Sequence, residues 1–380
     1  MVYKIALKDA LLYIYIYIYS FYFALHDSVL NIQNSKIIIM ISTIPAVLII
    51  FKYGKFKIKN ILFFIVFGLI VLYSFYQFSY SDSKFILLFL TGLVISCYDD
   101  DTVFKTLLSS KFFVIVLILI LGGFNHRNAI GSNFGTLIFL ICIVFERNFQ
   151  KKIFFATFLF FSILTLYLIN PENSGVIVVL SVFMVLYLLK DFHMTEKLLT
   201  SRLTNYIYPI SFLINLFLSY SVYSSTVPII GRFLPSVFNE KVLVLVNKVN
   251  IILGTRLSLA KTALIEIPIV LFGGRDFLSK YTLLLNDAVL NRKYFLVDSG
   301  YILLLLKFGV IPLMAFMYFS TKSIKYFKKN NFQILIILSI CFALWGILED
   351  NLFYGFTVFF WAKGFELSTD KITSHKRLVK

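Results

Sequence analysis

A short polar turn between two apolar runs holds the residues best suited to acid–base chemistry. It reads GGFNHRNAIG over residues 122–131 and contains His126, Arg127 and Asn128. A histidine exchanges a proton near neutral pH, an arginine binds phosphate through paired hydrogen bonds, and glycines permit a tight turn. The turn is a candidate site, and a polar hairpin tip at a membrane surface is the competing interpretation.

A second group of candidate residues lies in the hydrophilic segment 225–298. This segment carries nine Lys or Arg residues against five Asp or Glu residues, and Arg232, Arg256 and Arg275 are among them. Guanidinium groups suit phosphate, so a lipid-linked pyrophosphate is a chemically sensible ligand. Contact with anionic lipid headgroups explains the same charges.

Acidic residues occur in two places where they invite a functional interpretation. Glu349 and Asp350 end an apolar run in LEDNLFYG, where an acid can serve as a general base, a sugar anchor or a simple interfacial cap. The run Asp99–Asp101 resembles a metal or nucleotide-sugar site, but a solvated acidic turn is favoured. The three cysteines are far apart and lack metal-ligand spacing, so they predict no metal site. No Gly-rich phosphate loop and no HExxH motif occurs, and no cofactor is expected.

The composition of the chain indicates which class of protein holds these residues in place. The chain has 380 residues, of which 59% are hydrophobic and only 14% are charged, against about 25% charged in a typical soluble domain. No soluble globule hides so much apolar surface, so the bilayer is the expected solvent. The net charge of +17 is attributed to cytoplasmic loops, and nucleic-acid binding is not expected.

Twelve apolar runs predict about twelve transmembrane helices in an all-α polytopic membrane protein. They lie at 10–25, 37–51, 61–78, 84–98, 112–123, 129–145, 153–169, 175–190, 206–223, 300–319, 331–348 and 351–365. The run at 112–123 is the weakest because of its length. Tyr13 to Tyr19 alternate with isoleucines as in a strand, but a lone strand in lipid leaves its backbone unpaired, so a helix is expected.

The positive charges orient these spans. With the N-terminus inside, the inner segments carry 23 Lys and Arg residues, Lys105 and Lys111 among them, and the short outer loops carry three. Both termini are therefore expected in the cytoplasm of a multi-pass protein of the cytoplasmic membrane. The expected organisation is nine spans over 1–224, an external loop over 225–298, three spans over 299–366 and a basic cytoplasmic tail over 367–380.

Two parts of the external loop have structure of their own. Residues 241–259 have the apolar spacing of an amphipathic helix lying in the membrane interface. The apolar run 262–272 is short and contains Pro268, so it is expected to be re-entrant or interfacial rather than spanning.

In order and spacing, these motifs resemble the O-antigen polymerase/ligase superfamily, in its capsular or exopolysaccharide repeat-unit polymerase branch. The matching elements are GFNHRNAIG at 123–131, Arg256 followed by LFGG at 271–274, DSGYILLLLKFG from Asp298 to Gly309, and Glu349. Arg127 replaces a usual proline in the first element, and Ser299 replaces a frequent asparagine in the third.

The resemblance implies a glycosyltransferase of the membrane C type that uses neither a metal nor a nucleotide sugar. Its donor would be an oligosaccharide on undecaprenyl pyrophosphate, its acceptor a second lipid-linked repeat unit, and its partners membrane lipids, a chain-length regulator and a flippase. Arg256 would stabilise the departing pyrophosphate, and His126 or, second, Glu349 would take the acceptor proton. The residues expected to contact substrate are Arg127, Asn128, Arg232, Arg275, Asp298 and Tyr301.

Three alternatives stay open at this point. A polysaccharide ligase of the same superfamily shares the chemistry and differs in its acceptor. A flippase or transporter should show internal repeats and short loops on both sides, and neither is seen. A transferase that uses a polyprenyl-phosphate sugar usually has an acidic pair in the first outer loop, where this chain has only Asp27.

Overall fold

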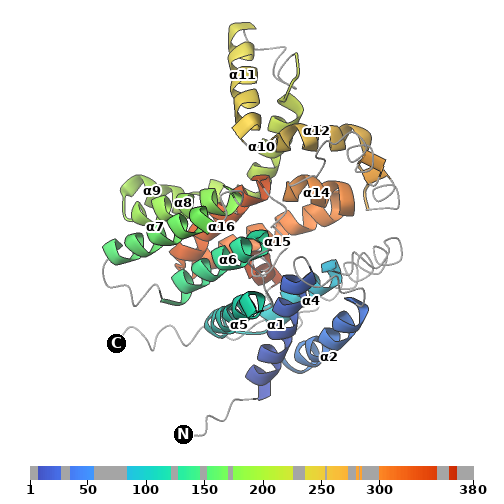
Figure 1. Ribbon diagram of the computed structural model, residues 1–380, viewed down its shortest axis with the longest axis vertical. Helices are drawn as coiled ribbons and strands as arrows, with labels where there is room; N and C mark the ends of the chain where they lie inside the picture. Colours follow the sequence, from blue (N-terminus) through green and yellow to red (C-terminus); the bar gives the residue numbers. More distant parts are fainter. Residues whose placement is uncertain are drawn as a thin grey trace.

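The computed structural model describes most, but not all, of the chain. The described residues are 7–26, 35–54, 84–120, 127–145, 152–169, 174–225, 236–252, 255–272, 280–281, 283–284, 299–348 and 359–365. Within these ranges all regular structure is helical and no strand occurs, which confirms the all-α class (Figure 1).

Most of the larger helices coincide with the apolar runs of the sequence, and α11 and α12 lie in the hydrophilic segment 225–298. They are α1 (Leu7–His26), α2 (Ser35–Tyr53), α4 (Lys84–Ser96), α5 (Asp100–Ile120), α6 (Arg127–Phe145), α7 (Lys152–Ile169), α8 (Ser174–Leu188), α10 (Ile207–Ser221), α11 (Ser236–Ile252), α12 (Arg256–Glu266), α14 (Gly300–Phe308), α15 (Val310–Lys329) and α16 (Gln333–Leu348). Shorter helices are α9 (His193–Thr200), η4 (Arg202–Tyr206), α17 (Phe359–Ala362) and η7 (Lys363–Phe365). The alternating Tyr and Ile residues lie in α1, so the prediction of a helix there is confirmed.

Length and hydropathy identify fewer membrane spans than the sequence predicts. Among the described residues α5 alone is long and apolar enough to cross a bilayer unaided, and two bent helix pairs, α8 with α9 and α11 with α12, pass as candidates when each pair is taken together. Four further apolar helices are shorter, and the run 61–78 lies outside the described residues. The prediction that the α5 span begins at 112 is wrong, because Asp99 accepts the Thr102 N–H at 2.9 Å and starts the helix a dozen residues earlier.

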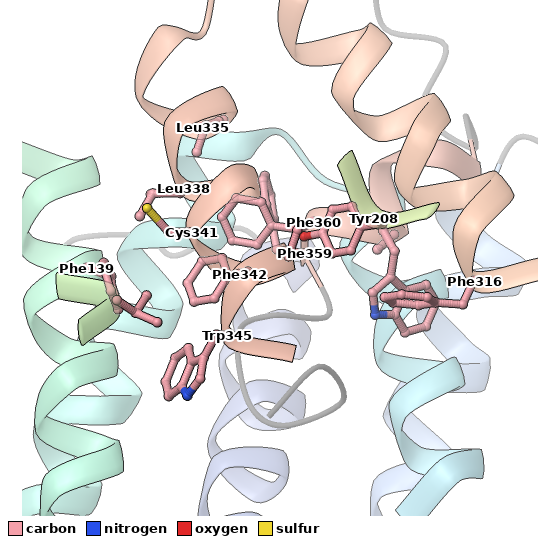
Figure 2. Packing of buried hydrophobic residues seen from close by; sticks show 14 of the residues in the cluster. Phe139, Tyr208, Phe316, Leu335, Leu338, Cys341, Phe342, Trp345, Phe359 and Phe360 are labelled. Carbon is pink, nitrogen blue, oxygen red and sulfur yellow. The ribbon is translucent and has the colours of Figure 1, made fainter. Parts of the chain in front are cut away.

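The centre of the protein is α16, which packs against α8, α10, α14 and α15. Nearly all of its side chains are buried. Aromatic rings link it to its neighbours: the Phe342 ring lies 5.3 Å from Phe139 of α6, 5.7 Å from Trp345 and 4.8 Å from Phe360 of α17 (Figure 2). This packing fixes the C-terminal end of α16, where the candidate site lies.

The run 300–319 is two helices and not one continuous span. Gly309 has φ of 93°, a conformation that side chains disfavour, and it separates α14 from α15. Residues 267–272 run past this break, and the carbonyls of Val270 and Leu271 accept the N–H groups of Val310 and Ile311 at 3.0 and 3.1 Å. The run 300–319 is therefore not one continuous helix, because these carbonyls replace the helical partners that a continuous helix would supply.

The helix predicted over 241–259 also ends early. α11 stops at Ile252, and α12 leaves at 103° after Thr255, whose φ of 66° is left-handed. Figure 1 shows α12 lying crosswise to α11, above α14 and beside α10. The turn places Arg256 at the first position of α12, against the helices below.

Candidate functional site

The structure describes the side chains of two of the residues expected in the site, Arg256 and Tyr301. Arg127 and Asn128 form the first turn of α6, but only their backbone is described. The remaining predicted residues, His126, Arg232, Arg275, Asp298 and Glu349, lie outside the described residues.

Arg256 is held where α12 meets the end of α16. The side-chain oxygen of the buried Asn250 accepts the Ser258 N–H at 3.1 Å, which caps the first turn of α12. The Arg256 Nη1 donates to the carbonyl oxygen of Leu348 at 2.9 Å. Because Leu348 is the last residue of α16, the guanidinium lies at the negative end of that helix dipole.

Lys261 is a second cation of α12, and sequence reasoning did not single it out among the nine basic residues of the loop. Its Nζ donates to the carbonyl of Val222 at 2.5 Å and to the Ser224 hydroxyl at 2.9 Å, at the C-terminal end of α10. The two cations of α12 therefore cap the ends of two neighbouring helices, α16 and α10.

The start of α14 packs against the same end of α16. Ser299 caps α14 by accepting the Ile302 N–H, receives a hydrogen bond from the Asn215 amide of α10, and donates to the Gly346 carbonyl at 3.4 Å. The Tyr301 hydroxyl donates to the Ala343 carbonyl at 3.0 Å.

These contacts bear on two expectations from the sequence. Ser299, which departs from the motif of the superfamily that the sequence resembles, caps α14. Tyr301 is fully buried, and its role as a substrate contact stays a prediction.

Arg256 and Ser299, which belong to two of the motif elements, thus both contact the C-terminal end of α16. Arg256 contacts Leu348 directly, and Ser299 contacts Gly346 one half-turn earlier. In the sequence Asp298 precedes Ser299 and Glu349 follows Leu348. The element GFNHRNAIG extends into the first turns of α6. This helix contacts α16 through the Phe139 ring, which lies beside Phe342 and Trp345.

An apolar cavity adjoins this end of α16. It has a volume of about 170 Å³ and lies between α8 and α16. Val179 and Val182 line one side, and Cys341, Leu344 and Leu348 line the other. Leu348 thus lines the cavity, and its carbonyl oxygen accepts a hydrogen bond from Arg256.

The acidic run Asp99–Asp101 is structural in a way that the sequence did not predict. Asp100 is not solvated: its side chain is 15% exposed and forms an ion pair of 2.6 Å with Lys363. It also accepts the Tyr326 hydroxyl at 3.2 Å. Burial, reinforced by the Asp100 carboxylate, raises the pKa of Tyr326 above its ordinary value, so the phenol keeps the proton that it donates.

The other two acids of this run behave differently. Asp99 caps α5, and Asp101 pairs with Lys105 at 2.7 Å on an exposed face. Among the described residues no three His, Cys, Asp or Glu side chains gather as a metal site would require.

Lys111 is a buried cation that sequence reasoning placed among the cytoplasmic residues. It lies in the middle of α5, is 5% exposed, and its Nζ donates to the Asn133 side-chain oxygen of α6 at 2.8 Å. The lysine therefore belongs to the α5–α6 interface, and it does not count toward the charge bias of the loops.

Comparisons with models of known protein families, with curated protein sequences and with solved structures found no match to this chain.

Proposed function

We propose that the protein is a membrane glycosyltransferase that joins oligosaccharide repeat units carried on undecaprenyl pyrophosphate at the outer face of the cytoplasmic membrane. The observation that carries this proposal is the position of Leu348, between an arginine and an apolar cavity. Its carbonyl accepts a hydrogen bond from the Arg256 guanidinium, and Leu348 also lines the cavity between α8 and α16. A polyprenyl pyrophosphate needs this combination, a cation for the phosphates beside apolar space for the first isoprene units.

The proposed reaction is a displacement at the anomeric carbon of the donor sugar. A hydroxyl of the acceptor repeat unit forms the new glycosidic bond, and the bond between the anomeric carbon and the pyrophosphate oxygen breaks. The pyrophosphate leaves with the electron pair, and the hydroxyl proton passes to His126 or Glu349. Undecaprenyl pyrophosphate is released, and no cofactor enters the balance.

Arg256 supplies the stabilisation in this proposal. Negative charge grows on the departing pyrophosphate, so a guanidinium held in place before reaction stabilises the transition state more than the ground state. The Asn250 cap of α12 and the Leu348 carbonyl preorganise that guanidinium. The break at Gly309 supports this arrangement, because irregular backbone at membrane depth is tolerated where it is buried or lines a site.

The test is deletion of the gene followed by analysis of the lipid-linked glycans. Loss of polymer with accumulation of single undecaprenyl-linked repeat units at the outer face is the expected result. Complementation with Arg256→Ala should leave that phenotype, whereas complementation with Lys241→Ala, which removes an exposed cation of α11, should restore polymer. Normal polymer in the deletion strain excludes the polymerase function, repeat units trapped on the inner face indicate a flippase, and polymer that is made but not transferred indicates a ligase.

A further inference from the structure

The segment that joins α8 to α10 carries several strongly exposed apolar side chains. We name residues 190–206, which contain α9 and η4, the elbow. Phe192, Met194, Leu198 and Leu203 of the elbow are 65%, 83%, 48% and 69% exposed. Exposing four apolar side chains of one short segment to water costs free energy, so we expect something other than water to cover them.

The elbow is nevertheless firmly attached to the protein. Leu199 and Thr204 are buried, and the Thr204 hydroxyl donates to the Leu198 carbonyl. Lys328 of α15 donates from Nζ to the Ser201 carbonyl at 2.5 Å, and the Lys325 Nζ lies 5.8 Å from the Tyr206 ring centre. The exposed apolar side chains are therefore presented by a fixed scaffold.

The direction of α9 suits a membrane surface. α9 leaves α8 at 113°, and α8 is an expected span. If α8 runs along the membrane normal, this angle lays α9 close to the membrane plane. The elbow follows the end of α8 that the positive-inside count assigns to the cytoplasm.

The charges around the elbow identify what covers it. The elbow carries Lys190, Lys197 and Arg202 against Asp191 and Glu196, and the part of α15 packed on η4 adds Lys322, Lys325, Lys328 and Lys329. Among the described helices, α10 and α16 also pack against the elbow, and neither carries a charged residue. Burial lowers the pKa of Lys328, in keeping with its place beneath the elbow rather than at the surface.

We propose that the elbow is an in-plane anchor that binds the acidic phospholipids of the cytoplasmic leaflet. Its apolar side chains enter the upper acyl region, and Lys197, Arg202 and Lys325 contact headgroup phosphates. Exposed apolar residues interleaved with an excess of cations are typical of helices that lie on anionic membranes. The inference rests on the proposed membrane placement of α8 and not on the proposed reaction.

The test measures how deeply single labels enter the bilayer. The native cysteines Cys97, Cys142 and Cys341 are all buried, so a cysteine introduced at an exposed position is labelled selectively. The full-length protein is reconstituted into nanodiscs of phosphatidylcholine with brominated acyl chains, with or without phosphatidylglycerol. A fluorophore is attached at Met194→Cys, at Glu196→Cys as the polar-face control, and at Val185→Cys on the exposed side of α8.

We expect the label at position 194 to be quenched by the bromines several-fold more than the label at 196, and more strongly with phosphatidylglycerol. The label at 185 should be quenched in both lipids. An unquenched label at 194 beside a quenched label at 185 overturns the proposal and leaves the elbow to another protein or to water. An unquenched label at 185 instead overturns the membrane placement of α8, and with it the basis of the inference.

Charge variants provide the second arm. Lys197→Gln with Arg202→Gln should remove the response to phosphatidylglycerol, and Lys241→Gln with Lys248→Gln on α11 should leave it intact. These four lysines and arginines are exposed, so the changes spare the core. An unchanged response in the elbow variant shows that its cations do not bind the headgroups and overturns that part of the proposal.

Discussion

Gly309 and Leu271 lie so close that no other residue fits at position 309. A methyl group built on Gly309 would lie 2.6 Å from the carbonyl oxygen of Leu271, and the φ of 93° at Gly309 adds strain to any side chain. The same Leu271 carbonyl accepts the N–H of Ile311, so the contact cannot open without losing that hydrogen bond. This contact ties the segment after α12 to the break between α14 and α15, and so helps to fix α12.

Gly309→Ala is therefore expected to destabilise the protein by about 3 kcal/mol or more. The measurement is thermal or denaturant unfolding of the purified protein in detergent. Ala315→Gly, the reverse exchange in the middle of α15, is the matched control and should cost about 1 kcal/mol. Equal effects of the two substitutions would show that the Leu271 carbonyl can move aside.

The ion pair between Asp100 and Lys363 is expected to contribute strongly to stability because both side chains are largely removed from water. Asp100→Asn or Lys363→Met should each cost about 3–5 kcal/mol, since each leaves the other charge buried without its partner. The double variant should cost clearly less than the sum of the two single variants, which a double-mutant cycle on unfolding free energies measures.

Its neighbour supplies the control for this prediction. Asp101 pairs with Lys105 at a similar distance, but these side chains are 73% and 57% exposed. Asp101→Asn should change the unfolding free energy by only about 0.3–0.5 kcal/mol. If Asp100→Asn lowers the unfolding free energy by as little as Asp101→Asn does, water must reach the ion pair between Asp100 and Lys363.

Sequence reasoning recovers the helical class because long apolar runs have one solution in a membrane, and it recovers the alternating Tyr13–Tyr19 run as a helix for the same reason. It fails at Gly309, because a break inside a hydrophobic run depends on the carbonyls of Val270 and Leu271, which come from a distant segment. A hydropathy profile does not report a hydrogen-bond partner that lies forty residues away in the sequence.

The same limit applies to the charged residues. The count of positive charges treats each lysine as solvated, yet Lys111 and Lys363 are buried in helix contacts with Asn133 and Asp100. For the candidate site, Arg256 and Ser299 both contact the end of α16, but the sequence singled out Ser299 only as a departure from the motif. The functional role expected of Arg256 stays a prediction. Lys261 was missed because its role depends on the end of α10 lying beneath α12.

Arg256 and Lys261 should differ in what they contribute, although both cap helix ends from α12. Arg256→Ala is expected to lower the rate of polymer formation about a hundredfold or more, and Arg256→Lys should recover part of it. Lys261→Met removes hydrogen bonds to Val222 and Ser224 and should lower stability by about 1–3 kcal/mol, with kcat within a few-fold of the unaltered protein. The measurements are kcat on a lipid-linked donor and the unfolding free energy. A kcat lowered equally by both changes would indicate that α12 acts only as a scaffold.

Filling the cavity between α8 and α16 should separate binding of the lipid tail from chemistry. Val182 lines the cavity, and Phe at this position would occupy space that the proposed isoprene units need. Val182→Phe is expected to raise KM for the lipid-linked donor several-fold with a smaller effect on kcat, because the Arg256 contact with Leu348 is left in place. Val185→Phe is the matched control, because Val185 of the same helix is 48% exposed, and it should leave KM unchanged.

The comparison also needs both variants to unfold at the temperature of the unaltered protein, because an overpacked core lowers activity without any change in binding. An unchanged KM in a stable Val182→Phe protein would place the lipid tail elsewhere, since a blocked cavity cannot hold it.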